Sequence, residues 1–319
     1  MTLFTVEKRK FGWDEIIVAA QLWNEWGPFV ETVYEAQSCL QFANETKRVP
    51  TSAEMRETAN SFRYSHNLIS GEETQLWLER WGMSAGQWMD CLRGLYVRQQ
   101  WLLQAKQIAN CYNSNQDNDL LKNYAVCTGK LDEWATRLAG HAAIAAASND
   151  LLDESVSTNQ LIEQIEEKFQ QGCKQRVTNQ LVEAKICDHR LEWIHYECRC
   201  LWLPEEAMAR EAALCVSEDG LTLDQVAADA QCELREWNFY ADEIEISVRP
   251  YFLAARPGDL LGPWRLREKY PLFSVLSKRL PHSDDPRIRT RAEDAIVAGL
   301  LAQAINERVH WVEQSFPQD

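Results

Sequence analysis

The chain has 319 residues, 45% hydrophobic and 25% charged, which is the composition of a folded globular protein and not of a disordered one. Its 48 acidic and 33 basic side chains give a formal net charge of −15, which disfavours binding to the phosphates of nucleic acid. The length suggests two domains. No apolar run is long enough to cross a bilayer and the first residues do not resemble a signal peptide, so we expect a cytoplasmic protein with no membrane contact.

The cysteine and glycine contents narrow the fold class further. Ten cysteines in a chain expected in a reducing compartment favour free buried thiols or ligands over disulfides. The 13 glycines are few for an open α/β sheet, and neither the Gly-x-Gly-x-x-Gly pattern nor the phosphate-binding loop pattern occurs. A nucleotide-binding α/β enzyme is therefore disfavoured, and we expect no cofactor.

Helical patterns dominate residues 1–184. Apolar residues recur at helical spacing from Trp13 to about residue 42, and Gly27-Pro28 predicts a break within this stretch. Three helices are expected over 54–103, with breaks at Ser70-Gly71 and at 81–84. Further helices are expected over 131–147 and 158–183. We therefore predict an all-α domain over residues 1–184.

The pattern changes after residue 184. Residues 191–203 are rich in aromatic and apolar side chains, which predicts a strand within them, and Pro204 suits the start of a helix over 205–216. The remaining predicted elements are a short helix over 222–230, strands over 244–248 and 272–276, and a charged helix over 286–310. The predicted fold class is α+β: a large all-α N-terminal domain (1–184), a small α+β domain (185–285) and a C-terminal helix (286–319).

Four short segments follow one another in a recognisable order. They are Glu205-Glu206-Ala207, the run Gly-Leu-Thr-Leu-Asp-Gln-Val-Ala over 220–227, Pro-Gly-Asp-Leu-Leu-Gly-Pro over 257–263, and Tyr-Pro-Leu-Phe-Ser-Val over 270–275. This order resembles the parvulin-type (PpiC) peptidyl-prolyl isomerase domain. The helical region, above all 72–95, resembles the N-terminal peptide-binding region of SurA-type and PrsA-type foldases. The resemblance covers about residues 45–290 and is strongest to cytosolic PpiC-related proteins of bacterial systems that mature ribosomally made peptides.

The resemblance also implies two histidines, which would form a hydrogen-bonded floor beneath a prolyl ring. The first-strand position falls on Cys198 or Cys200 and the last-strand position on Pro271 or Leu272, while His195 lies three or more residues early. An isomerase needs no acid–base chemistry in principle, because it only has to favour the twisted amide. The loss of both histidines nevertheless predicts a peptide-sized apolar cleft with little or no isomerase activity.

Five soft or borderline metal ligands lie within 14 residues: Cys187, His189, His195, Cys198 and Cys200. Zinc binds such side chains tetrahedrally, but this spacing is not that of a finger or ribbon, and buried free cysteines account for the pattern. We therefore expect no metal and keep the five as a zinc alternative. His195, Cys198 and Cys200 are also the candidate catalytic residues, as a thiol activated by an imidazole, although no third group or oxyanion loop is recognisable.

Tryptophans and cations supply the candidate peptide-binding residues. Trp77, Trp81, Trp88 and Trp101 are spaced to share one face within or across packed helices, as core packing or as an aromatic groove for extended peptide. The predicted peptide-binding residues are Trp77, Trp81, Trp88, Trp202, Arg249, Trp264, Arg265, Arg267 and Phe273. The three arginines of this list and Lys269 lie within residues 249–291. This segment has ten basic and four acidic side chains, a surplus that would attract an acidic peptide.

Three functions follow as hypotheses. The first is a cytosolic foldase-like chaperone that binds an unfolded or precursor peptide and presents it for maturation, with a peptide-modifying enzyme as a second partner. The alternative is an enzyme that modifies or isomerises a peptide in the remodelled cleft, in which case substitution of Cys198, Cys200 or His195 would abolish turnover. The third is a purely structural subunit with no affinity for peptide.

Overall fold

The computed structural model describes residues 2–105, 118–147, 156–266 and 268–312. Its contacts divide the chain into two compact units, which we call unit 1 (residues 1–174 and 300–319) and unit 2 (residues 175–299). The domain boundaries predicted from the sequence lie after residues 184 and 285 instead. The two divisions differ because α13 (Pro286–Arg308) is one continuous helix whose first part belongs to unit 2 and whose last part belongs to unit 1.

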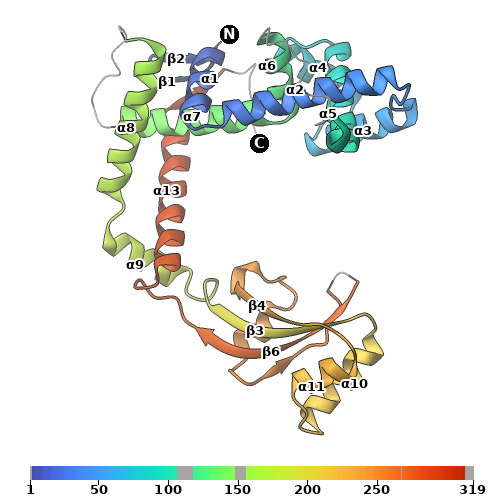
Figure 1. Cartoon of the computed structure of the whole chain (residues 1–319). Coiled ribbons are helices and arrows are strands. Elements are labelled where there is room, and N and C mark those ends of the chain that lie inside the picture. Colours follow the sequence, from blue (N-terminus) through green and yellow to red (C-terminus); the bar gives the residue numbers. More distant parts are fainter. Residues whose placement is uncertain (1, 106–117, 148–155, 267, 313–319) are drawn as a thin grey trace. The chain divides into compact units, whose positions relative to one another are not determined.

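Unit 1 is mainly helical (Figure 1). Its helices are α1 (Trp13–Leu22), α2 (Trp26–Glu45), α3 (Ser52–Ser65), α4 (Gly71–Trp81), α5 (Ala85–Ala105), α6 (Asn118–Cys127), α7 (Lys130–Ala146) and most of α8 (Thr158–Arg176). The long helices α2 and α5 pack along each other, and α7 packs against α1 and β1. The predicted helices over 54–103 and 131–147 are thereby confirmed.

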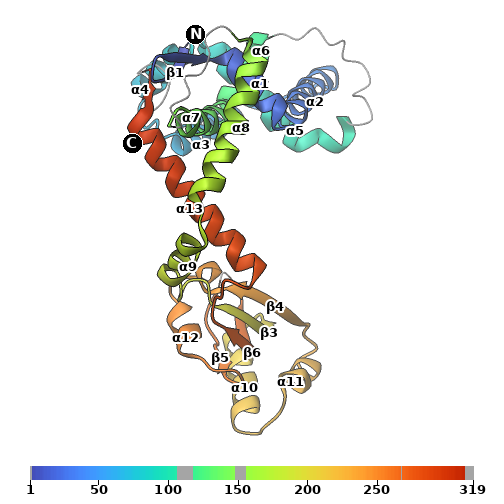
Figure 2. The same cartoon turned by 90° about the vertical axis from the view of Figure 1, so that its left-hand side faces the viewer.

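A small sheet in unit 1 was not predicted. It consists of β1 (Thr2–Val6), β2 (Arg9–Gly12) and β7 (Val309–Trp311), in the order β2-β1-β7 and antiparallel throughout. Figure 2 shows β1 beside the end of α13. The strands are short and one of them comes from the far end of the chain, so no local pattern reveals the pairing. The prediction of an all-α N-terminal domain was wrong in this respect.

Two predicted helix boundaries also move. The break expected at Gly27-Pro28 lies at residues 23–25 instead, because Pro28 falls in the first turn of α2, where its missing N–H has no helical partner to lose. The helix expected over 158–183 divides into α8 and α9 (Asn179–Asp188). Thr178 caps α9, since its hydroxyl accepts a hydrogen bond from the backbone N–H of Leu181 at 3.3 Å.

Unit 2 is built on a four-stranded antiparallel sheet with the strand order β4-β3-β6-β5. Its elements are α9, β3 (His195–Leu203), α10 (Glu206–Ser217), α11 (Leu223–Asp229), β4 (Leu234–Tyr240), the 3₁₀ turn η2 (Ala241–Glu243), α12 (Arg249–Ala254), β5 (Leu260–Leu261), β6 (Tyr270–Arg279) and the start of α13. The prediction of a strand over 244–248 was wrong, because these residues form turns. The observed strand is β4, which begins ten residues earlier. The chain is therefore α+β with a helical majority, as predicted.

The alternation of β3 and β6 separates two apolar clusters. Leu201, Leu203 and Leu272 point to one face, where α10 and α11 cover them (Figure 1). Tyr196, Cys198 and Cys200 point to the other face and pack with residues of β4, α12 and β6. The first face is a closed core. The second face carries the site described next.

Candidate functional site

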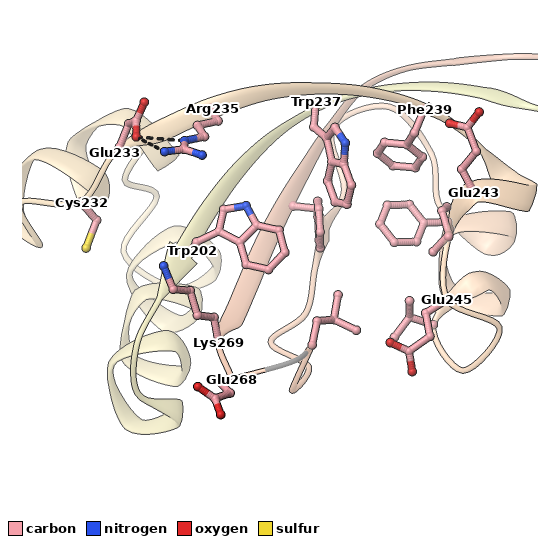
Figure 3. A pocket seen from close by; sticks show the side chains of 15 residues that line it. Trp202, Cys232, Glu233, Arg235, Trp237, Phe239, Glu243, Glu245, Glu268 and Lys269 are labelled. Atoms are coloured by element: carbon pink, nitrogen blue, oxygen red, sulfur yellow. Dashed lines mark hydrogen bonds and ion pairs between the residues drawn. The ribbon is translucent and has the colours of Figure 1, made fainter. Parts of the chain in front are cut away.

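An open pocket lies on the second face of the unit 2 sheet. Its volume is about 900 Å³, enough for one or two side chains of a peptide ligand. The residues that line it are Trp202, Cys232, Glu233, Arg235, Trp237, Phe239, Glu243, Ile244, Glu245, Val248, Phe252, Leu266, Glu268, Lys269 and Phe273. Figure 3 shows the aromatic rings at its centre and the charged side chains around them. We call it the aromatic pocket.

Strand alternation explains why the rings gather on this face. Trp237 of β4 lies opposite Cys198 of the central strand β3, and Phe273 of β6 lies opposite Cys200. The central strand thus contributes small side chains, and the large rings from both neighbouring strands close over them. The Trp237 and Phe273 ring centroids are 5.5 Å apart and the ring planes are inclined by 28°, and the Trp237 and Phe239 centroids are 5.0 Å apart.

The opposite wall comes from the segment that follows β4. Phe252 of α12 is fully buried, and its ring lies 5.4 Å from Phe239 and 5.2 Å from Phe273. Trp237, by contrast, is 41% exposed and forms the accessible part of the pocket. A buried ring therefore fixes the wall, and an exposed ring remains free to contact a ligand.

Cys198 and Cys200 lie beneath the rings and are fully buried. Burial raises the pKa of each thiol to about 12. Both thiols stay protonated near neutral pH, and the thiolate is the form that attacks carbon or binds a metal. The two candidate catalytic cysteines are therefore packing residues of the pocket floor in this geometry.

His195 is on the same strand but on the opposite face. Its ring packs edge-on against Tyr240, with 5.2 Å between centroids, and its Nδ1 lies 3.3 Å from Nη2 of Arg279. Burial, and after it the charge of Arg279, lowers the pKa of His195. The structure does not bring this imidazole to either cysteine, so the predicted thiol–imidazole pair is not assembled.

The five zinc candidates do not converge either. Cys187 is exposed at the end of α9, and Nδ1 of His189 lies 2.5 Å from a Glu192 oxygen while its ring stacks on Trp193. Residues 2–105, 118–147, 156–266 and 268–312 contain no group of three or more histidine, cysteine, aspartate or glutamate side chains placed to hold a metal ion.

The predicted peptide-binding residues of unit 2 have different positions. Trp202 and Phe273 line the aromatic pocket, and Trp264 packs behind it on Phe252, at 5.9 Å between centroids. Arg249 donates hydrogen bonds from Nη2 to the carbonyl oxygens of residues 242 and 244, a structural role. Arg265 is exposed and does not line the pocket, and Arg267 lies outside the described residues.

Trp77, Trp81 and Trp88 belong to unit 1. Phe62 joins two of them, with ring centroids 5.4 Å from Trp77 and 5.6 Å from Trp88. Trp81 and Trp88 are buried and Trp77 is half-buried. These contacts fit the core-packing interpretation of the tryptophan spacing, because the rings fill space between α3, α4 and α5.

Sequence reasoning missed Trp237, Phe239 and Phe252. The first two were missed because the strand was placed over 244–248. The signal was present in the run Leu-Arg-Glu-Trp-Asn-Phe-Tyr, where Trp237 and Phe239 flank the polar Asn238 and follow Glu236, an alternation typical of a half-buried strand.

Charge is distributed unevenly around the pocket. Nε and Nη2 of Arg235 both donate to Oε2 of Glu233, at 2.9 and 2.6 Å, so the two charges neutralise each other. Lys269 and Glu268 are adjacent in the sequence and also line the pocket. On the Phe239 side of the pocket, Glu243 lies at the upper edge of the lining and Glu245 at the lower edge, apart from each other (Figure 3). We call these two residues the carboxylate wall.

Compared with protein-family models and with curated proteins, the chain matches none of them. Among the described residues no helix combines the length and the apolar character needed to span a membrane.

Proposed function

We propose that this protein is a foldase-like peptide-binding chaperone that holds an apolar side chain of an unfolded or precursor peptide in the aromatic pocket. The observation that carries the proposal is the open pocket of about 900 Å³ walled by five aromatic side chains. Trp237 remains 41% exposed there, and large rigid rings provide contact area at a small entropic cost. A cytoplasmic location, the peptide and a peptide-modifying enzyme as second partner all belong to this proposal.

The order of elements in unit 2 supports the parvulin-type resemblance. A strand, β3, is followed by the helices α10 and α11, and the Pro-Gly-x-x-x-Gly-Pro segment contains β5 and leads into the last strand, β6. Gly262 in that segment has φ of 103°, and a Cβ there would lie 2.5 Å from the carbonyl oxygen of Pro271. The turn therefore requires glycine for its approach to β6.

The pocket floor favours binding over chemistry. Cys200 and Phe273 face each other across β3 and β6, and both point to the pocket. Leu272, one of the positions implied for a histidine, points instead to the α10 and α11 side. Burial raises the pKa values of the Cys198 and Cys200 thiols, so neither thiol is a nucleophile or a base near neutral pH. We therefore propose that peptide is held without acid–base or nucleophilic steps.

The proposal is tested with a fluorescently labelled peptide, Gly-Ser-Ala-Phe-Pro-Ser-Gly with both ends capped. Its anisotropy is followed as the wild-type protein, Trp237→Ala or Trp77→Ala is added. Loss of the exposed ring in Trp237→Ala is expected to weaken binding by about tenfold or more, the scale of an aromatic hot spot. Trp77→Ala serves as the matched control in unit 1. Equal affinity of the wild-type protein and Trp237→Ala would overturn the proposal.

The enzyme alternative is separated by exchange NMR on the same peptide. An apolar site can accelerate prolyl rotation without proton transfer, because the twisted amide is less polar than the planar one. Cis–trans exchange peaks that appear with a small amount of protein would mean that the pocket isomerises the peptide. We expect broadened or shifted peptide signals without such peaks.

A further inference from the structure

The charged side chains that surround the rings differ between the two ends of the aromatic pocket. At one end Glu233, Arg235, Glu268 and Lys269 balance each other, with two positive and two negative charges. At the other end the carboxylate wall, Glu243 and Glu245, has two negative charges (Figure 3). A ligand therefore meets a neutral end and an acidic end of the same apolar pocket.

The two carboxylates differ in what already contacts them. Glu243 accepts a hydrogen bond from the backbone N–H of Tyr240 at 3.1 Å, and one of its oxygens lies 4.0 Å from Nη1 of Arg291, at the limit of an ion pair. Glu245 accepts a hydrogen bond from the hydroxyl of Ser247 at 2.8 Å. Within the part of the chain that the structure describes, Glu245 forms no ion pair, so its charge is available to a ligand.

Apolar residues flank Glu245 in the chain: Ile244 lines the pocket, and Ile246 does not. Ile246 follows Glu245 directly and is 79% exposed. An apolar lining residue next to a carboxylate fits an amphipathic ligand, whose stem packs on Ile244 and whose charge reaches Glu245. Lysine and arginine are the side chains with that form.

We propose that the pocket selects a peptide in which a lysine or arginine directly neighbours the apolar or prolyl residue held by the rings, with the cation at the carboxylate wall. This inference rests on the proposed function. It assigns a substrate class opposite to the acidic peptide expected from the basic surplus of residues 249–291. The described cations on which that expectation was based do not offer free positive charge to the pocket. Arg249 hydrogen-bonds to backbone carbonyl oxygens, Arg265 does not line the pocket, and Lys269 lies beside Glu268.

The test compares four capped peptides in the same anisotropy assay. They are Gly-Ser-Ala-Phe-Pro-Ser-Gly, the variants with Lys or Glu in place of Ala, and the variant with Lys directly after Pro. The two lysine peptides cover both directions in which a peptide can lie in the pocket. At least one of them is expected to bind about two- to fivefold more tightly than the alanine peptide, as one exposed or half-exposed ion pair with a carboxylate supplies. The glutamate peptide is expected to bind more weakly.

Two variants locate the effect. Glu243→Gln/Glu245→Gln should remove the advantage of the lysine peptide over the alanine peptide, whereas a variant outside the pocket should keep it. Glu236→Gln is the matched control, since it neutralises a carboxylate on β4 that does not line the pocket. The advantage should also shrink as salt rises from about 0.05 M to about 0.5 M, because exposed ion pairs are screened.

The outcomes separate the two proposals. If the alanine peptide binds and neither lysine peptide binds more tightly, or if the advantage persists in the double variant, the charge selection is overturned while the proposed function stands. If no peptide binds to the wild-type protein, the proposed function fails and the selection fails with it.

Discussion

Both units gather tryptophan rings, but the rings are used differently. In unit 1, Trp134 is fully buried and packs at 5.2 Å from Phe29 and 6.0 Å from Trp26, and its indole N–H donates to Glu25 at 2.6 Å. In unit 2, Trp237 contacts Phe239 and Phe273 on one side and is open to solvent on the other. Tryptophan suits a core and a binding surface equally, so its surroundings decide which of the two it forms.

The difference follows from what surrounds each ring. Unit 1 offers helices on several sides, so a large ring fills the space between them and its N–H finds an acceptor. The second face of the unit 2 sheet is covered by the one-and-a-half-turn helix α12 and by the turns around it, and part of the ring surface stays uncovered. The comparison predicts that substitutions in unit 1 alter stability and substitutions in the aromatic pocket alter binding.

The largest expected effect concerns the thiols of the pocket floor. Cys198 and Cys200 have pKa values raised to about 12 by burial, so the reactive thiolate is about a thousandfold rarer than for a thiol of ordinary pKa near 9. At pH 8, iodoacetamide should modify the exposed Cys187 while both floor cysteines remain unmodified until the protein unfolds. Peptide mapping by mass spectrometry measures this. Rapid native modification of Cys200 would mean that the floor is reachable, and would reopen the nucleophile hypothesis.

The second prediction sets one ring of each unit against the other. Trp134→Ala should lower the free energy of unfolding by about 3–5 kcal/mol, since it leaves a cavity and removes the donor to Oε2 of Glu25, whose Oε1 keeps its ion pair with Arg137. Trp237→Ala should cost less, about 1–2 kcal/mol, because the ring is 41% exposed and only part of its surface leaves water on folding. Urea denaturation followed by circular dichroism gives both values. A larger loss for Trp237→Ala would contradict the division between core and binding rings.

The third prediction concerns a partly buried polar network in unit 1. Oε1 of Glu166 lies 2.6 Å from Nδ1 of His141 and accepts from the indole N–H of Trp23 at 3.1 Å. Glu166→Leu should cost about 3 kcal/mol, because the buried His141 and the half-buried Trp23 lose their partner. Glu166→Gln keeps an acceptor and should cost clearly less. Equal losses for the two variants in the same urea titration would argue against this network.

The smallest effect depends on pH. Burial, opposed by the charges of His66 and Arg80, raises the pKa of Asp132 from 3.8 to about 6. The folded state therefore binds this proton more tightly than the unfolded state. The protein consequently loses folding stability as the pH rises from about 4 to about 6. Relative to Asp132→Asn, the wild-type protein should become less stable across that window by about 1–2 kcal/mol. Urea midpoints at pH 4.5 and pH 7.5 measure the difference, and a pH-independent difference would refute the assignment.

Local sequence signals predicted much of the helical framework. Thr51 and Ser70 cap α3 and α4 with their hydroxyls, and each has a glutamate three residues later that completes the capping box. Thr222 caps α11 in the same way with Gln225. Such signals need no distant partner, which is why the helix starts could be predicted.

The remaining features depend on distant partners. The β1–β7 pairing joins residues about 305 positions apart, and nothing near Val309 in the sequence reveals it. The site shows the same limit: Trp202 and Phe273 could be predicted as binding residues, whereas Trp237 required the register of β4 against β3. Alternation along β3 alone places His195 and Cys200 on opposite faces, but which of the two faces carries the pocket depends on the neighbouring strands and on α12.

The most direct test of the central claim observes the tryptophans themselves. Indole N–H signals of ¹⁵N-labelled protein are assigned with single Trp→Phe variants and followed during titration with the peptide of tightest affinity. The account predicts that the signals of Trp202 and Trp237 shift and saturate together, while those of Trp77, Trp81 and Trp88 stay in place. Shifts confined to the three unit 1 tryptophans would contradict it and would place peptide binding on the helical unit instead.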